Sequence, residues 1–247
     1  MKIALWLVLF LTQCGLVATA QDTRYYDLRV YSVLPGKTEG VLERFRDFVN
    51  KVRARHGVET VGSWVAKGST NDTYIYILSA PTKELFDQGE KAFASDPEFK
   101  AGYAANAEKH GKTLGGIRAF PMSARHAKLN FKSADKPRAF DLRLYTTSPG
   151  KTEAFWNRWR EHATRLYQRQ GLASVGFWKA DKKDKDGNDQ VIVLLAGDSV
   201  EAINAGIARF HQDEEWLKIE RETEKDGKLR SSVEAFKMLP TDFSPLK

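Results

Sequence analysis

Cysteine is almost absent from this chain of 247 residues. Its one cysteine, Cys14, lies within the first twenty residues. If that segment is removed, the remaining chain can form no disulfide, use no cysteine nucleophile and bind no metal through a thiolate. A packed core must then supply the stability, and the 227 residues after position 20 are enough to bury one or two such cores.

The first twenty residues resemble a secretory signal peptide. Lys2 provides the basic start, an apolar run covers residues 3–10, and Ala18-Thr19-Ala20 has the small residues of a cleavage site. The run is shorter than the roughly 20 apolar residues that a spanning helix needs. We therefore expect no stable membrane span, and export to the periplasm or the medium after cleavage at Ala20.

A lipid anchor at Cys14 is the alternative fate of this segment. Leu11-Thr12-Gln13-Cys14 resembles a lipobox, the motif that directs lipidation of a cysteine. Gln13 stands where that motif has a small residue, which argues against lipid anchoring. We keep signal cleavage as the expectation.

The sequence also lacks a concentration of one charge and the familiar catalytic motifs. After position 20 it has 38 basic and 32 acidic residues, a net charge of +6, and the basic residues do not gather on one element. We therefore expect no nucleic-acid partner. Motifs typical of nucleotide sites, serine hydrolases and zinc proteases are missing, and the five histidines show no metal-ligand spacing. The sequence predicts no metal site, identifies no catalytic residue and specifies no cofactor.

The chain contains one long internal repeat. Tyr26-Asp27-Leu28-Arg29-Val30-Tyr31 recurs 114 residues later as Phe140-Asp141-Leu142-Arg143-Leu144-Tyr145. The spacing also relates Trp64 to Trp178, then becomes 117 after a charged insertion at 182–189 and 116 near the end. We expect a signal segment at 1–20, copy one at 21–122, a linker at 123–138, copy two at 139–240 and a tail at 241–247.

Each copy shows the pattern βαββαβ. In copy one we expect strands at 25–34, 59–67, 73–79 and 113–122, with helices at 37–56 and 81–110. The second helix should break at Ser95-Asp96-Pro97, because Asp caps helices and Pro suits a first helical turn. In copy two we expect strands at 139–148, 172–181, 189–196 and 229–239, with helices at 150–170 and 199–225.

This order describes a ferredoxin-like unit of the α+β class, in which helices cover one face of an antiparallel sheet. The other face would be an exposed apolar patch. Two tandem copies bury it by pressing these faces together, which predicts an intrachain pseudo-dimeric α+β barrel. A free sheet edge could also pair with another chain, so a homo-oligomer is compatible with this fold.

Three segments carry a resemblance to a known family. Asp27-Leu28-Arg29-Val30-Tyr31, Val61-Gly62-Ser63-Trp64 and Ser95-Asp96-Pro97-Glu98-Phe99 resemble signature segments of NIPSNAP domains, and all three recur in copy two. The resemblance covers residues 24–122 and 138–239. It implies the dimeric α+β-barrel fold, which is shared with small monooxygenases and haem-handling proteins. It transfers no catalytic residue.

Alternation along the first strand predicts its two faces. We expect Leu28 and Val30 to point toward the helices, while Asp27, Arg29 and Tyr31 line the barrel. Copy two repeats these residue types. One interpretation is structural, with Asp–Arg ion pairs across the pseudo-two-fold axis. The other is functional, with an arginine that holds an anionic ligand and a tyrosine that donates a hydrogen bond to it.

Aromatic residues complete the candidate site. Trp64 and Trp178 are either core residues or a pair that stacks on a planar ligand. Tyr74 and Tyr76 stand where copy two has valines, so copy one has more polar groups and is the favoured binding half. The candidate ligand-binding residues are Arg29, Tyr31, Trp64, Tyr76, Arg143, Tyr145 and Trp178.

Two functional hypotheses follow. The first is an exported module that binds a small anionic or apolar ligand or interacts with a partner. The alternative is a barrel-type monooxygenase or haem-handling enzyme, which rests on shared architecture alone.

Overall fold

The computed structural model describes residues 22–125 and 136–247. The expected signal segment, Cys14 and most of the expected linker lie outside these residues. Within this part of the chain, no helix is both long and apolar enough to cross a membrane.

Copy one has the predicted order of elements, with one local surprise. Its strands are β1 (Tyr25–Val33), β2 (Glu59–Ala66), β3 (Thr73–Ala80) and β4 (Leu114–Ala124). Its helices are α1 (Thr38–Arg44), α2 (Asn50–Arg55), α3 (Lys83–Ser95) and α4 (Pro97–His110). A π-helical turn, η1 (Phe45–Val49), joins α1 to α2 where we expected one regular helix. The break between α3 and α4 is as predicted, with Asp96 as cap: its carboxylate accepts hydrogen bonds from the backbone N–H groups of Glu98 and Phe99.

Copy two repeats this order, the π-helical turn included. Its strands are β5 (Ala139–Thr147), β6 (Ala173–Ala180), β7 (Gln190–Gly197) and β8 (Arg230–Pro240). Its helical segments are α5 (Thr152–Arg158), η2 (Trp159–Ala163), α6 (Thr164–Arg169), α7 (Val200–Gln212) and α8 (Glu214–Thr223). The tandem βαββαβ prediction is confirmed.

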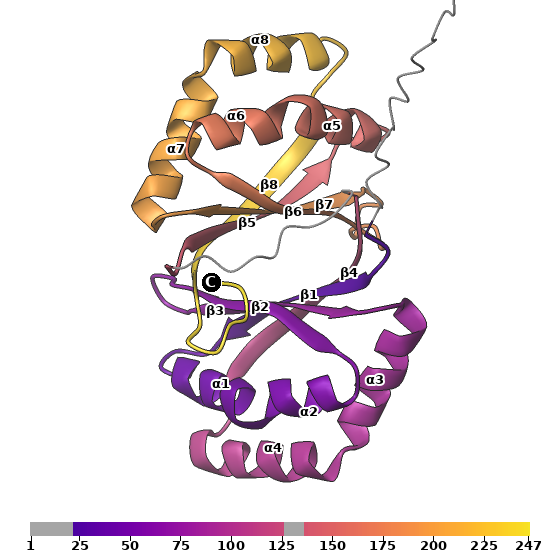
Figure 1. Cartoon of the computed structure of the whole chain (residues 1–247), viewed down its shortest axis with the longest axis vertical. Helices are drawn as coiled ribbons and strands as arrows, with labels where there is room; N and C mark the ends of the chain where they lie inside the picture. The colour runs from indigo at the N-terminus through magenta and orange to yellow at the C-terminus, as the bar shows by residue number, and fades with distance from the viewer. Residues whose placement is uncertain (1–21, 126–135) are drawn as a thin grey trace, which may run out of the picture.

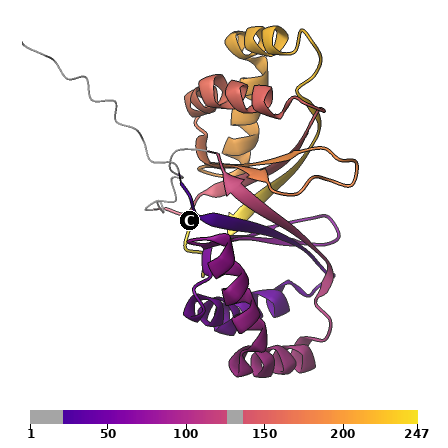
Figure 2. The same cartoon turned by 90° about the vertical axis from the view of Figure 1, so that its right-hand side faces the viewer.

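The two sheets close into one barrel. All eight strands pair antiparallel in the order β1-β3-β2-β8-β5-β7-β6-β4. The copies join where β2 meets β8 and β4 meets β6. The helices of each copy cover the outer face of its own sheet, so the molecule has a helical layer at each end and the barrel between them (Figures 1 and 2). The predicted intrachain pseudo-dimeric α+β barrel is confirmed.

The barrel interior is an apolar core that both copies share. Leu28 and Val30 of β1 meet Leu142 and Leu144 of β5 in one buried cluster. Trp64 and Trp178 belong to the same cluster and are 0% exposed. The C-terminal tail closes part of it, since Leu246 is buried there and Thr241 and Ser244 bond to Ser63 on β2.

Our assignment of the two faces of β1 is therefore wrong. Leu28 and Val30 line the barrel, whereas Tyr31 packs with Val41 and Phe45 in the cluster beneath the helices of copy one. The physical reason is that the barrel interior around Leu28 and Val30 is mostly apolar, while the helix side offers charged partners such as Glu90. Burial of a charge without such partners is unfavourable.

Candidate ligand-binding site

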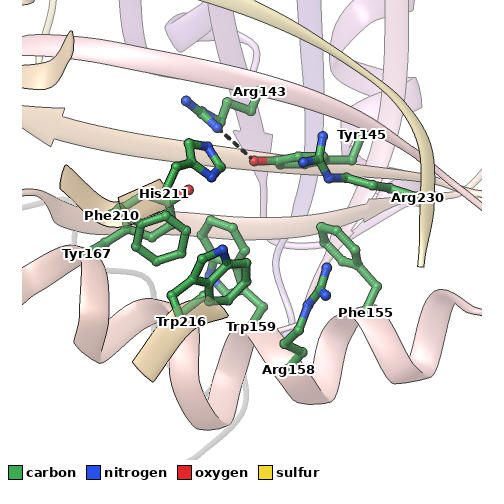
Figure 3. A pocket seen from close by; sticks show the side chains of 11 residues that line it. Arg143, Tyr145, Phe155, Arg158, Trp159, Tyr167, Phe210, His211, Trp216 and Arg230 are labelled. Atoms are coloured by element: carbon green, nitrogen blue, oxygen red, sulfur yellow. Dashed lines mark hydrogen bonds between the residues drawn. The ribbon is translucent and has the colours of Figure 1, made fainter. Parts of the chain in front are cut away.

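Each copy has a cavity between the outer face of its sheet and its covering helices. The copy-one cavity has a volume of about 130 Å³, and its walls include Tyr31, Arg44, Phe45, Phe99 and Ile117. The copy-two cavity has a volume of only about 20 Å³. Figure 3 shows its walls, which include Arg143, Tyr145, Trp159, His211, Trp216 and Arg230. The two cavities occupy equivalent positions in the repeat.

Ring size accounts for much of the difference in volume. Phe45 and Phe99 of copy one correspond to Trp159 and Trp216 of copy two, at the repeat spacings of 114 and 117. Both tryptophans are buried. Two indoles occupy more space than two phenyl rings, so copy two fills the volume that copy one leaves open.

The π-helical turns shape both walls. Phe45 begins η1 and Val49 ends it, and both residues line the copy-one cavity. Trp159 and Ala163 hold the same positions in η2 and line the copy-two cavity. A π-helical turn changes the direction of the following side chains, and such turns are frequent at functional sites.

Arg44 is an unusual wall residue of the copy-one cavity. It is only 6% exposed. Its guanidinium lies 5.7 Å from the ring centre of Phe45 and 5.5 Å from that of Tyr103. Among the described residues it makes no ion pair. Arg44 is thus a mostly buried cation that lies against two aromatic rings, has no counter-charge among the described residues and keeps some contact of its guanidinium with solvent.

The equivalent arginine of copy two has a carboxylate partner. Arg158 donates to Glu224 Oε1 at 2.9 Å and to Thr223 Oγ1 at 3.2 Å. The spacing of 117 in this helix pair places Asn106 and Ala107 at the positions of Thr223 and Glu224. Copy one therefore has no carboxylate at the position that neutralises Arg158.

A network of paired charges adjoins the copy-one cavity, and one of its members, Arg53, lines the cavity wall. Arg29 Nε donates to Asp27 Oδ1 at 2.5 Å, and Arg53 Nε donates to Glu90 Oε1 at 2.8 Å. Arg29 also approaches Glu90 Oε2 at 3.8 Å. Burial lowers the pKa of Arg29, but the hydrogen bond and charge of Asp27 outweigh it and hold this pKa above its ordinary value. These charges are already paired within copy one.

Two tyrosines connect this network to the cavity. Burial raises the pKa of Tyr76 well above its ordinary value, so its phenol stays neutral. Its hydroxyl donates to Tyr31 Oη at 2.6 Å. Because Tyr31 accepts this bond, its own proton remains for donation, and Tyr31 is a wall residue of the cavity.

Copy two arranges its polar groups differently. Arg143 donates to Asp141 Oδ2 at 2.7 Å and to Tyr145 Oη at 3.1 Å, as Figure 3 shows for the tyrosine. Lys237 also donates to Asp141, at 2.8 Å. Burial lowers the pKa of His211, and the nearby cations Arg143 and Arg230 lower it further. The copy-two site is cationic, but aromatic rings fill it.

The structure separates the residues that the sequence placed in one site. Tyr31 and Tyr145 line the two cavities, and Arg143 lines the second. Arg29 and Tyr76 lie beneath the first cavity, in the polar network. Trp64 and Trp178 lie in the barrel core and line neither cavity.

One structural prediction about these residues is wrong. We expected Asp–Arg ion pairs across the pseudo-two-fold axis, but Arg29 pairs with Asp27 and Arg143 with Asp141, each within its own strand. The reason is that the charged face of each strand points to its own helices, away from the other copy. The sequence reasoning also missed Arg44, although its recurrence as Arg158 in the repeat was a usable signal.

Neither cavity fits haem. The copy-one cavity, at about 130 Å³, is far smaller than a haem, and its lining offers tyrosine but no histidine, cysteine or methionine as a ligand for the iron. The copy-two cavity has His211 in its wall, but its volume of about 20 Å³ holds little more than one water. No group of three or more potential metal ligands occurs in residues 22–125 and 136–247.

Comparison with known proteins identifies the family. The NIPSNAP family profile matches residues 26–116 and 140–245, one segment in each copy. The chain belongs to the NIPSNAP family. A search of curated proteins finds no match to this NIPSNAP protein.

Solved structures share the fold at low sequence identity. A presumed monooxygenase from Fusobacterium nucleatum is 10% identical with a TM-score of 0.60, over 88% of this chain and 92% of its own. An anthrone oxidase-like protein is 13% identical with a TM-score of 0.60, over 94% and 97%. A NIPSNAP family protein from Agrobacterium tumefaciens is 21% identical with a TM-score of 0.38, over 49% and 100%. At these identities the likeness to the first two structures, each with a TM-score of 0.60, concerns the fold alone.

Proposed function

We propose that this NIPSNAP protein binds a small ligand with an apolar body in the copy-one cavity. The observation that carries the proposal is a cavity of about 130 Å³ whose counterpart in the same chain is filled by two indoles. A cavity of about 150 Å³ lined by apolar side chains is known to bind benzene. The copy-one cavity therefore suits one aromatic ring or a short branched aliphatic chain.

The walls of the cavity support this size and polarity. Phe45, Phe93 and Phe99 provide apolar surface, and Tyr31 provides one hydroxyl donor. Two wall residues, Ile117 and Tyr103, are 56% and 49% exposed, and we infer that the ligand enters on their side. A few polar groups in a mostly apolar cleft are typical of small-molecule sites.

We further propose that the protein meets this ligand after export, because residues 1–20 resemble a signal peptide. N-terminal sequencing of the exported protein should find Gln21 first. An intact Met1 in that fraction would contradict export with cleavage. An oxygenase activity rests on similarity of fold, which does not assign a reaction.

A neutral aromatic probe tests the binding proposal. We expect the mature chain to bind 4-fluorotoluene at one saturable site, observed as broadening or a shift of its ¹⁹F NMR signal. Phe45→Trp should abolish this binding, because it places in copy one the indole that fills copy two. Trp159→Leu, at the equivalent position of copy two, is the control: it should keep copy-one binding and, because it enlarges the copy-two cavity, can change the stoichiometry only by adding a second site.

Two outcomes would contradict the proposal. One is a wild-type protein that shows no saturable binding of the probe. The other is a folded Phe45→Trp protein, verified by a cooperative thermal transition, that binds the probe as tightly as the wild type.

A further inference from the structure

The equivalent arginines Arg44 and Arg158 differ in whether a carboxylate pairs with them. Both arginines are buried, both end the first helical segment of their copy, and both line an equivalent cavity. Arg158 has Glu224 at 2.9 Å. Arg44 makes no ion pair or side-chain hydrogen bond among the residues that the structure describes, and its guanidinium lies near the rings of Phe45 and Tyr103.

Two carboxylates of copy one, those of Glu43 and Glu90, are paired with other side chains. Glu43, the neighbour of Arg44 in the chain, accepts from Lys109 at 2.8 Å and from His110 at 2.9 Å. Glu90 is paired with Arg53 at 2.8 Å. Buried arginine is rarely left without a partner, because removing a charge from water is unfavourable unless a counter-charge compensates it.

We propose that the ligand of the copy-one cavity carries a carboxylate that pairs with Arg44. This inference rests on the proposed function and names its ligand class: a small monocarboxylate whose body is one aromatic ring or a short branched chain. In the complex, the ligand provides to Arg44 the counter-charge that Glu224 provides to Arg158.

The chemistry of the wall fits this class. A guanidinium forms two parallel hydrogen bonds with a carboxylate, and its fixed planar shape favours that group over a point charge. Phe45, Phe93 and Phe99 then contact the apolar body. Tyr31 lies in the same wall and has a proton to donate, so it can bind a carboxylate oxygen as well.

A pair of isosteric probes tests the inference on the mature full-length chain. The probes are 4-fluorophenylacetate and 4-fluorophenylacetamide, which differ in charge and little in shape. We expect the carboxylate to bind roughly 10- to 100-fold more tightly than the amide, the range expected for a hydrogen bond to a charged group in a partly buried site. Isothermal titration calorimetry and ¹⁹F NMR measure both affinities.

Arginine variants assign the effect to one residue. Arg44→Met should remove the preference for the carboxylate while the amide still binds. Arg44→Lys keeps the charge and loses the planar guanidinium, so it should keep part of the preference for the carboxylate. It replaces Arg44→Met as the test if the methionine variant does not fold. Arg158→Met is the matched control, and it should leave the preference unchanged because Arg158 belongs to the filled site.

The outcomes separate this inference from the proposed function. Equal affinity for the two probes, or an unchanged preference in folded Arg44→Met or Arg44→Lys, overturns the inference and leaves small-ligand binding in place. Failure of 4-fluorotoluene and both isosteric probes to bind overturns both. A preference that is lost in Arg158→Met would place the carboxylate in copy two and overturn the assignment to Arg44.

Discussion

The two copies have the same backbone plan and use their helix–sheet interface in different ways. Copy one leaves a cavity of about 130 Å³ and surrounds it with phenyl rings. Copy two fills the same place with Trp159 and Trp216 and leaves about 20 Å³. Within one chain, the fold is held constant while a few side chains decide whether space remains. The comparison illustrates why a site, and not a fold, determines what a protein binds.

The two copies also differ at the position of Arg53, where only copy one has an ion pair. Copy one has the Arg53–Glu90 ion pair at its cavity, with Arg53 in the wall. In copy two the equivalent of Arg53 is Tyr167, which stacks on Phe210 with ring centres 3.9 Å apart. Replacing a buried ion pair with packed apolar groups is often neutral or stabilising. At this position copy two therefore has stacked aromatic rings where copy one has an ion pair.

The largest effect should come from separating the copies. Residues 21–125 alone would expose the face of the sheet that carries Leu28, Val30 and Trp64, all buried in the shared core. We expect this fragment to aggregate or to form a homodimer that rebuilds the barrel. Size-exclusion chromatography with light scattering measures its mass, with the mature chain as control. A soluble, cooperatively folding monomer would disprove the shared-core interpretation.

Removing one arginine from each first strand should affect copy one more than copy two. Arg29→Met leaves Asp27 without its hydrogen-bonded partner, whereas Arg143→Met leaves Asp141 with Lys237 at 2.8 Å. Breaking a buried pair costs about 3–5 kcal/mol, which we expect for Arg29→Met. A remaining charged partner should reduce the cost of Arg143→Met to about 1–3 kcal/mol.

Urea unfolding of both variants at pH 7 measures this difference in the free energy of unfolding. The double variant Arg143→Met/Lys237→Met is the informative control. It removes both charged partners of Asp141, so its loss in the free energy of unfolding should match that of Arg29→Met. If Arg29→Met and Arg143→Met lose the same free energy of unfolding, Lys237 does not compensate Asp141 for the loss of Arg143.

A cavity can be opened in copy two by one substitution. Trp159→Phe removes part of a buried indole whose Nε1 has no hydrogen-bond partner among the described residues. The loss of packing should cost about 1–2 kcal/mol, since removing buried atoms leaves a void. The variant should then bind a second equivalent of 4-fluorotoluene, counted by ¹⁹F NMR titration. An unchanged stoichiometry would mean that ring size does not close this site.

The smallest effect concerns the two aspartate caps. Hydrogen bonds from Arg55 and His56 hold the pKa of Asp96 below its ordinary value of 3.8, and Arg169 lowers the pKa of Asp213 in the same way. A lowered pKa in the folded state means that the unfolded chain takes up the proton first. The stabilising effect is therefore present above about pH 4 and is lost as the pH falls through the lowered pKa.

Thermal unfolding between pH 7 and pH 2 tests this effect, because the loss begins near pH 4 and continues below it. The Tm of the wild type should fall with acidification, and it should fall less steeply in Asp96→Asn and Asp213→Asn, because asparagine still caps a helix but does not titrate in this range. Identical pH dependence in all three proteins would remove the caps from the explanation.

Much of the architecture could be predicted from the sequence. The 114-residue repeat, the βαββαβ order and the break at Ser95-Asp96-Pro97 are local patterns, set by hydrophobic period and by cap and turn residues. The pairing of the copies followed from one further argument, the need to bury the open face of each sheet. The first three features depend on interactions between residues that are near in sequence. The pairing of the copies depends on the need of any sheet to bury its apolar face.

Tertiary structure alone decided which face of β1 lines the barrel, because alternation defines two faces and both are covered in this fold. It also decided where the π-helical turns fall, since an apolar stripe with steps of three and four does not reveal one extra residue in a turn. The isolation of Arg44 was equally beyond the sequence. Its repeat partner Arg158 meets Glu224, 66 residues away in the chain, and only the packed helices show that copy one has no carboxylate at that place.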